Sequence, residues 1–250
     1  MTKDNVRHWD KDRAEAYDKR VREAIPGYDA LHVLSCQIVA EATSGQGRAL
    51  VVGAGTGVEC IALAESCPNL AVVGVDPSAD MLAHAEGKVR AHGLTQRVRL
   101  YPSKVGDLPK FEPFDAATLL LVMHFLADDG AKQSLLEEIS GHLKPGAPLV
   151  LADLFGSWEE SWQQQLRGWW RHLQLAAGIP EDEVEKGFRH IDRDIHPLRE
   201  DRLTELLAAS GFGPPEPYFR ALCFGGWVYK KGWSWNIAML KTPCRAVCLV

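Results

Sequence analysis

Short apolar runs alternate with amphipathic segments through the middle of the chain. The apolar runs, each short enough for one buried strand, lie near residues 48–53, 70–76, 97–101, 114–121 and 147–154. Segments with helical spacing separate these runs, near residues 57–66, 79–92 and 130–142. Because strands that alternate with helices form a parallel sheet with right-handed crossovers, we predict an α/β fold.

Further elements are expected on both sides of this alternating region. Before it, a charged helical pattern, a break and a more apolar helix occupy residues 10–23, 25–28 and 31–42. After it, a long helix, a short acidic helix, a loop of alternating charges and another helix are expected over residues 157–177, 181–186, 189–196 and 200–210. Two strands near 217–223 and 226–231 complete the sheet, and Gly225-Gly226 is compatible with a hairpin turn between them.

The most informative local pattern is an apolar run that breaks into glycines at alternate positions, Gly53, Gly55 and Gly57. Glycine allows the backbone to turn sharply and to approach a ligand closely. The next apolar run ends at Asp76, and an acid at the tip of such a strand can accept both hydroxyls of a ribose. Together these features predict a nucleoside site at the carboxyl edge of a parallel sheet.

The spacing of the glycines separates this loop from other nucleotide-binding loops. A dinucleotide site would read Gly-x-Gly-x-x-Gly, but Val58 stands at the position of the third glycine. The sequence also lacks the Gly-x-x-x-x-Gly-Lys-Ser/Thr pattern of a P-loop. Gly-x-Gly-x-Gly with a downstream acid instead resembles motif I and the acidic loop of class I S-adenosylmethionine (SAM) methyltransferases.

The resemblance extends over residues of roughly 10 to 231. Residues 143–146, before an apolar strand, are similar to the step that precedes strand five in that family, and residues 209–212 and 224–227 resemble the end of its fold. Residues 17–20 and 25–28 resemble the region before the core in the carboxy-SAM synthase subgroup, which is closest in layout.

This resemblance implies a Rossmann-like fold with a seven-stranded, mostly parallel sheet. It implies a single domain over residues 1–231, with N-terminal gate helices over 10–42 and a helical cap over 155–198. The tail, residues 232–250, has no counterpart in the family; an extra strand, a dimer arm and a disordered end are all open.

The resemblance also implies SAM as the cofactor and assigns residues to it. Asp76 should hold the ribose hydroxyls, and the backbone of Gly53 and Gly55 should lie against the methionine part. Tyr28 should reach over the sulfonium or the methionine carboxylate; for it and for Tyr17, plain packing is the alternative. Leu121 should line the pocket near the sulfonium. The remaining expected cofactor contacts are Ala54, Gly57, Pro77, Met81, Ser103, Lys104 and Val105.

Two positions depart from the family pattern. Val51 stands where the family usually has an acid, two residues before the first glycine of motif I. Ser103 and Lys104 stand where an acid often meets the adenine amino group. A charged lysine cannot accept a hydrogen bond, so we expect the adenine contact from Ser103, from a backbone carbonyl near Val105 or from water.

Three residues are candidates for catalysis. His124, after the fourth strand, and Asp153, at the end of the fifth, are each candidates for a general base. For His124 the alternative is a loop histidine that is hydrogen-bonded to the backbone. Arg193, or Arg189, could bind a carboxylate carried on the sulfonium, as the resemblance to carboxy-SAM synthase implies. The alternative for this segment is a solvated, salt-bridged loop.

The long helix expected over residues 157–177 carries an apolar stripe: Trp158, Trp162, Leu166, Trp169 and Leu173. Such a stripe is most often packing, so we expect cap packing with one or two tryptophans lining the acceptor site. An exposed stripe would instead favour a dimer or a lid.

Composition narrows the partners. The net charge of −5 and the pI near 6.0 give no electrostatic footprint for nucleic acid. The densely charged N-terminus shows no signal peptide, and the longest apolar stretch, residues 116–127, is too short to span a bilayer. The six cysteines lack zinc-ligand spacing, which favours reduced thiols in a cytoplasmic enzyme without a metal.

The sequence as a whole predicts a SAM-dependent methyltransferase that acts on a small-molecule acceptor, with a homodimer possible. Two alternatives stay open at this point. One is a SAM-modifying enzyme of the carboxy-SAM synthase type, and the other is a non-catalytic SAM-binding sensor.

Overall fold

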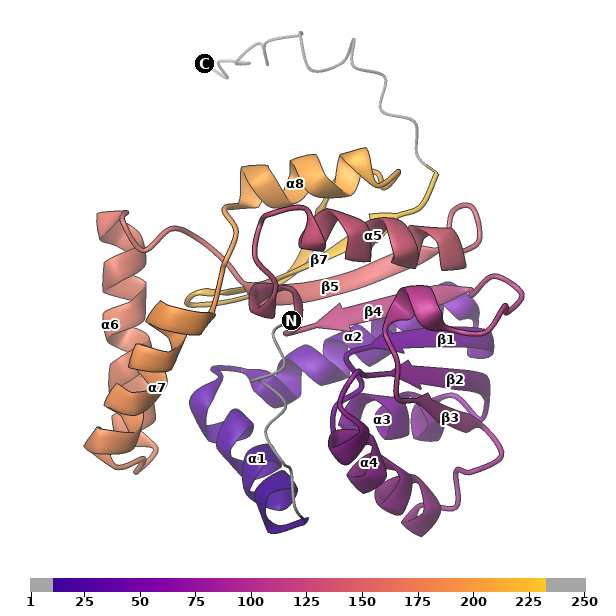
Figure 1. The fold of residues 1–250 in the computed structure, drawn as a ribbon, viewed down its shortest axis with the longest axis horizontal. Coiled ribbons are helices and arrows are strands. Elements are labelled where there is room, and N and C mark those ends of the chain that lie inside the picture. Colours follow the sequence, from indigo (N-terminus) through magenta and orange to yellow (C-terminus); the bar gives the residue numbers. More distant parts are fainter. Residues whose placement is uncertain (1–10, 233–250) are drawn as a thin grey trace, which may run out of the picture.

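A seven-stranded sheet runs through the molecule in the order β3-β2-β1-β4-β5-β7-β6 (Figure 1). The structure is a computed structural model, and it describes residues 11–232. The strands are β1 (Gln46–Val52), β2 (Asn69–Val75), β3 (Val98–Tyr101), β4 (Ala116–Leu120), β5 (Pro148–Leu154), β6 (Glu216–Ala221) and β7 (Phe224–Lys230). The first five strands are parallel to one another, whereas β7 pairs antiparallel with both β5 and β6. The predicted, mostly parallel sheet is therefore confirmed.

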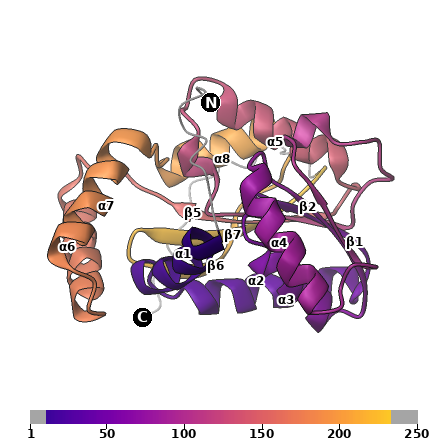
Figure 2. The ribbon, with the colours of Figure 1, turned by 60° about the horizontal axis from the view of Figure 1, so that its bottom comes forward.

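Helices cover both faces of the sheet. They are α1 (Lys11–Ala24), α2 (Tyr28–Thr43), α3 (Val58–Ser66), α4 (Ala79–Ala91), α5 (Ala131–His142), α6 (Ser161–Ala176), α7 (Glu181–Asp194) and α8 (Glu200–Ala209), with short 3-10 turns η2 (Val105–Asp107) and η3 (Met123–Phe125). Helices α5 and α8 pack on one face, and α2, α3 and α4 pack on the other. The pair α6–α7 stands beyond the end toward which β4 points, and α1 lies between this pair and α4 (Figures 1 and 2).

Successive residues of the central strands enter different cores, which explains their continuous apolar runs. In β5, Leu149 and Leu151 belong to the core under α5 and α8, while Val150 and Ala152 belong to the core under α2 and α3. Burial on both faces is typical of parallel strands covered by crossover helices. The carboxyl ends of β1, β2 and β4 are thereby held side by side.

The hairpin turn between the last two strands was predicted at the wrong place. Gly225 and Gly226 lie inside β7, and the turn is formed by Leu222 and Cys223 between the paired residues of β6 and β7. A Cβ on Gly225 would overlap the ring of Trp227, and one on Gly226 would lie 2.8 Å from the ring of Tyr218. These glycines leave room for aromatic rings rather than for a turn.

The segment predicted as a loop of alternating charges is helical. Helix α7 continues to Asp194, so it includes most of residues 189–196. Val184 and Phe188 are buried in the cap, and Ile191 packs against the same cluster. Apolar residues at this spacing form one helical face, so the charges between them lie on the other faces.

The apolar stripe of α6 does not pack as predicted. The helix begins only at Ser161, and Trp162, Trp169 and Leu173 are exposed. Trp170 is buried instead: its indole nitrogen donates to the carbonyl of Ala24 at 2.5 Å, and its ring contacts two phenylalanines of the cap. The buried face therefore lies beside the one that the stripe suggested.

Two further expectations concern the ends of the chain and membranes. Residues 233–250, nearly the whole of the predicted tail, lie outside the described residues. Within 11–232, none of the helices combines the length and the apolar character that crossing a bilayer requires.

Candidate active site

The glycine loop is a tight turn between β1 and α3. Gly53 and Ala54 both donate their backbone N–H to the carbonyl of Val75, at 2.8 and 3.0 Å. Gly53 has a φ of 75°, and a Cβ at this position would overlap the side chain of Val122. Gly57 has a φ of 82° and would place a Cβ 2.8 Å from that of Ala85. Larger residues at either position would strain the backbone and push its neighbours away.

Asp76 lies directly against this loop. One carboxylate oxygen accepts from the Gly55 N–H at 2.9 Å, and the other accepts from the Ser78 N–H at 2.8 Å. Burial raises the pKa of Asp76, and these two donors act in the opposite direction. Pro77 connects Asp76 to Ser78, which caps α4, and Met81 of that helix lies beside Gly55. The predicted acid is thus in register with the glycine loop.

Helices α1 and α2 bring two tyrosines to the same place. Burial, followed by the charges of Asp18 and Asp76, raises the pKa of Tyr17 to about 12. Burial and then Tyr17 raise the pKa of Tyr28, which shows that the two phenols are neighbours. Asp18 accepts from the Thr56 hydroxyl at 2.6 Å and forms an ion pair with Lys88 of α4. Helix α1 is therefore attached to the glycine loop.

The segment after β3 offers one unsatisfied donor. The Ser103 hydroxyl is buried and has no hydrogen-bond partner among residues 11–232. Lys104 precedes η2, and the carbonyl of the buried Val105 lies 3.3 Å from a ring nitrogen of His142. Of the three sources expected for the adenine contact, Ser103 is thus the one with an unused side-chain group.

The two candidate bases, which the sequence predicted separately, are hydrogen-bonded to each other. His124 lies on η3 after β4, and its Nδ1 is hydrogen-bonded to a carboxylate oxygen of Asp153 at the end of β5. The same oxygen accepts from the Leu154 N–H at 2.8 Å. Both side chains are largely buried. The alternative for His124 was a loop histidine that is hydrogen-bonded to the backbone, but its ring instead forms a histidine–carboxylate dyad with Asp153.

A strained turn leads from β4 to this dyad. Leu121 has a φ of 59°, in the left-handed region that non-glycine residues rarely adopt. Its N–H donates to Ala152 at 2.7 Å, and its side chain packs between the α2-side core and the cap. Val122, the next residue, contacts Gly53. The turn therefore links the glycine loop to His124.

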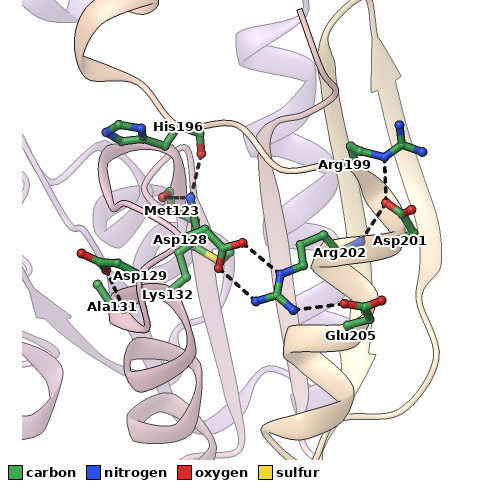
Figure 3. A network of polar contacts seen from close by, with 10 residues as sticks. All are labelled: Met123, Asp128, Asp129, Ala131, Lys132, His196, Arg199, Asp201, Arg202 and Glu205. Carbon is green, nitrogen blue, oxygen red and sulfur yellow. Dashed lines mark hydrogen bonds and ion pairs between the residues drawn. The ribbon is translucent and has the colours of Figure 1, made fainter. Parts of the chain in front are cut away.

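A buried lysine supports the same turn (Figure 3). Lys132 of α5 is 1% exposed, and its ammonium donates to the carbonyls of Met123 at 2.6 Å and of His196 at 2.8 Å. The His196 N–H in turn donates to the carbonyl of His124 at 2.7 Å. Burial lowers the pKa of Lys132, and the negative charge of Asp153 opposes that shift. Nothing in the sequence pattern singled out this lysine, which lies in an ordinary amphipathic helix.

The cap arginines do not join this group. The Arg193 side chain is 71% exposed and is paired with Asp194 on the outside of α7. Arg189 is also exposed. The alternative weighed for this segment, a solvated charge cluster, describes Arg193 better than a role at the sulfonium. Sequence reasoning also missed Asp18 and Thr56, although Asp18 follows the Tyr17 that it singled out.

The residues present fit a SAM molecule. A tight glycine turn, an acid in register with it, and an unsatisfied Ser103 hydroxyl lie along the ends of β1, β2 and β3. Within the described part of the chain, no group of histidine, cysteine and acidic side chains could hold a metal ion.

Comparison with known proteins gives the family. A family model described as a methyltransferase domain matches residues 50–149, which include the glycine loop, Asp76 and His124. Residues 50–149 therefore form a methyltransferase domain. The chain is a SAM-dependent methyltransferase, and its cofactor is SAM.

Two curated relatives illustrate the range of the family. The chain is 29% identical to a demethylmenaquinone methyltransferase of Porphyromonas gingivalis over 69% of this chain and 70% of that protein. It is 22% identical to a carboxy-SAM synthase of Photobacterium profundum over 87% of this chain and 89% of that protein.

Among solved structures, the methyltransferase is similar to an O-methyltransferase-like protein of Nostoc punctiforme with a TM-score of 0.61 and 18% identity. The match covers 81% of this chain but spans only 56% of that one. At this identity the likeness concerns the fold, and it agrees with the Rossmann-like sheet described above.

Proposed function

We propose that this methyltransferase transfers the methyl group of SAM to an oxygen or nitrogen atom of a small-molecule acceptor, with His124 as the general base. The observation that carries the proposal is the hydrogen bond between His124 Nδ1 and Asp153 at the carboxyl edge of the sheet. With Nδ1 bound to Asp153, Nε2 is the ring nitrogen that can accept a proton. A sensor that only binds SAM has no need of such a dyad.

Each residue of the dyad has a separate task. SAM supplies an electrophilic methyl group, so the chain has to hold the acceptor in line with it and remove the acceptor's proton. Asp153 orients the His124 ring and stabilises the positive charge that the ring gains with the proton. Lys132 fixes the turn that carries His124, through the carbonyl of Met123. The base is thus held by two different strands and a helix.

Three features support a small acceptor. The α6–α7 pair stands beyond the sheet edge where the dyad lies, as a cap would. The net charge of −5 gives no general attraction for nucleic acid. Two of the similar proteins, the demethylmenaquinone methyltransferase and the O-methyltransferase-like protein, are named for methyl transfer.

Carboxy-SAM synthesis is less well supported, because the exposed Arg193 does not reach the dyad.

The test is a kinetic comparison of His124→Gln and Asp153→Asn with the wild type. A panel of small phenols, catechols and amines is screened for formation of S-adenosylhomocysteine, and the best acceptor is used. We expect His124→Gln to lower kcat by about 10²- to 10⁴-fold, the typical range for loss of a general base, with unchanged affinity for SAM. Asp153→Asn should lower it by less, and the double variant should be no worse than His124→Gln.

The control is His92→Gln, because His92 is an exposed histidine on the surface that pairs with Glu65. Full activity of His124→Gln with every acceptor would contradict the proposal. An acceptor that turns over without any effect of pH or of the dyad variants would show transfer by orientation alone.

A further inference from the structure

Glu59 is a buried carboxylate in the first turn of α3, two residues after the last glycine of the loop. It is 6% exposed, and its Oε1 has no hydrogen-bond partner among the residues that the structure describes. A carboxylate removed from water without a counter-ion is costly. The chemistry proposed for His124 and Asp153 does not involve Glu59.

Glu59 lies close to the place where motif I of this chain lacks an acid. The family usually has an acid at the position of Val51, where this chain has an apolar residue. Val51 of β1 is directly opposite Thr118 of β4 in the sheet register. The Thr118 hydroxyl is also the neighbour that lowers the pKa of the Glu59 carboxylate. The acid therefore lies over the same strand pair, but it comes from α3 instead of β1.

The groups around Glu59 are neutral at pH 7. Burial raises the pKa values of Tyr28 and Cys36 on α2, of Cys60 on α3 and of Tyr218 on β6. His32, on α2 beside Tyr28, has its pKa lowered to about 4 by burial. Burial also raises the pKa of Glu59 to about 7, and Thr118 acts in the opposite direction. None of these groups supplies the positive charge that an ionised Glu59 needs.

SAM carries such a charge at its methionine end, in the α-ammonium group. Tyr28, which the sequence assigned to the sulfonium or the methionine carboxylate, is close enough to Glu59 for the charge of that carboxylate to raise the pKa of the phenol. We propose that Glu59 is the counter-ion of the α-ammonium group of SAM and replaces the acid that motif I lacks at Val51. The proposal rests on SAM as cofactor and is independent of the acceptor and of His124.

Proton release follows from this pairing. Without the ammonium, a pKa near 7 leaves Glu59 mostly protonated at pH 6; with it, the carboxylate is ionised. At pH 6, binding of SAM should therefore release about 0.9 proton, and affinity should rise roughly fivefold between pH 6 and pH 7. A ligand without the ammonium, such as 5′-methylthioadenosine, should release none and bind equally at both values.

The experiment is isothermal titration calorimetry of SAM and 5′-methylthioadenosine at pH 6 and pH 7, in buffers with different ionisation enthalpies. Glu59→Gln keeps the size of the side chain. It should weaken SAM about tenfold or more at pH 7 and abolish the proton release, while 5′-methylthioadenosine binds within twofold of wild type. Glu65→Gln, on the same helix but at the surface, is the matched control and should change neither ligand.

A rescue variant separates this role from a structural one. Val51→Asp in the Glu59→Gln background should recover most of the affinity for SAM, and thermal unfolding confirms that each variant is folded. Unchanged SAM binding by Glu59→Gln, or equal weakening of both ligands, would overturn the proposal. Failure of the dyad variants to affect turnover would leave these binding results as they are, so the two proposals fail separately.

Discussion

Two carboxylates from different elements contact the glycine loop. Asp76 accepts from the Gly55 N–H, whereas Asp18 accepts from the Thr56 hydroxyl next to it. Asp76 comes from the neighbouring strand and is fixed by the sheet. Asp18 comes from α1, so its contact with the loop depends on the position of that helix. The first carboxylate is therefore suited to recognition and the second to closure.

The role of Asp76 is tested by Asp76→Asn. An amide has one acceptor atom where the carboxylate has two, and it carries no charge, so it cannot serve both a backbone N–H and the ribose. Because hydrogen bonds to charged groups contribute about 1.5–3 kcal/mol, affinity for SAM should fall by about tenfold or more. Calorimetric titration measures the change.

The control for this substitution is Asp129→Asn. Asp129 accepts from the Ala131 N–H at the start of α5, a contact that the amide oxygen of asparagine makes equally well. The Asp129→Asn variant should therefore bind SAM with the same affinity as the wild type. Asp76→Asn with an unaltered Kd would mean that the ribose is held by other groups.

At the level of elements, helix α6 shows how little a stripe of aromatic residues says about burial. Trp169 and Trp170 are adjacent in sequence, yet the first is 48% and the second 4% exposed. Trp170 packs against Phe188 and Phe224 at ring distances of 5.0 Å and bonds to Ala24. It therefore ties α6 to α7, β7 and α1 at once.

This pair gives a matched prediction about stability. Trp170→Ala should lower the free energy of unfolding by about 3–5 kcal/mol, the usual cost of removing a buried tryptophan. Trp169→Ala should change it by less than about 0.5 kcal/mol, as surface substitutions do. Urea denaturation followed by circular dichroism measures both. Similar losses for the two variants would show that the exposed face of α6 is covered in solution, as a homodimer would require.

Across the whole molecule, α1 is the element that joins the glycine loop to the cap. Its Asp18 contacts Thr56 and Lys88 on one side, and its last residue, Ala24, accepts from Trp170 on the other. The sequence predicted a gate in this region. The hydrogen bond to the glycine loop and the ion pair with α4 are both made by the single side chain of Asp18, so they can break without loss of the sheet core.

A gate of this kind is tested by Asp18→Ala. The substitution removes both the Thr56 hydrogen bond and the Lys88 ion pair, so α1 should open more often. Because a charged hydrogen bond contributes about 1.5–3 kcal/mol and exposure reduces that, SAM should dissociate about three- to tenfold faster. Stopped-flow tryptophan fluorescence measures the rates. Lys19→Met is the control, since Lys19 is exposed and its ion pair with Glu23 lies within α1. An unchanged rate for Asp18→Ala would argue against a gate at α1.

Local chemistry determined the parts of this protein that the sequence predicted well. The five parallel strands, the helices between them and the glycine loop follow from periodicity and from the backbone freedom of Gly53, Gly55 and Gly57. Asp76 was predictable for the same reason, because its place at the end of a strand follows from the strand itself. The family resemblance rests on these same short segments.

Only the tertiary structure decided which distant groups meet. His124 and Asp153 are 29 residues apart and pair because β4 and β5 are neighbours in the sheet. Glu59 lies near Thr118 because α3 folds back over the sheet. The glycines of β7 serve rings, and Trp170 rather than Trp169 is buried, because packing selects faces that a pattern leaves equivalent. Periodicity gives the face of one element, and only the arrangement of all the elements gives its neighbours.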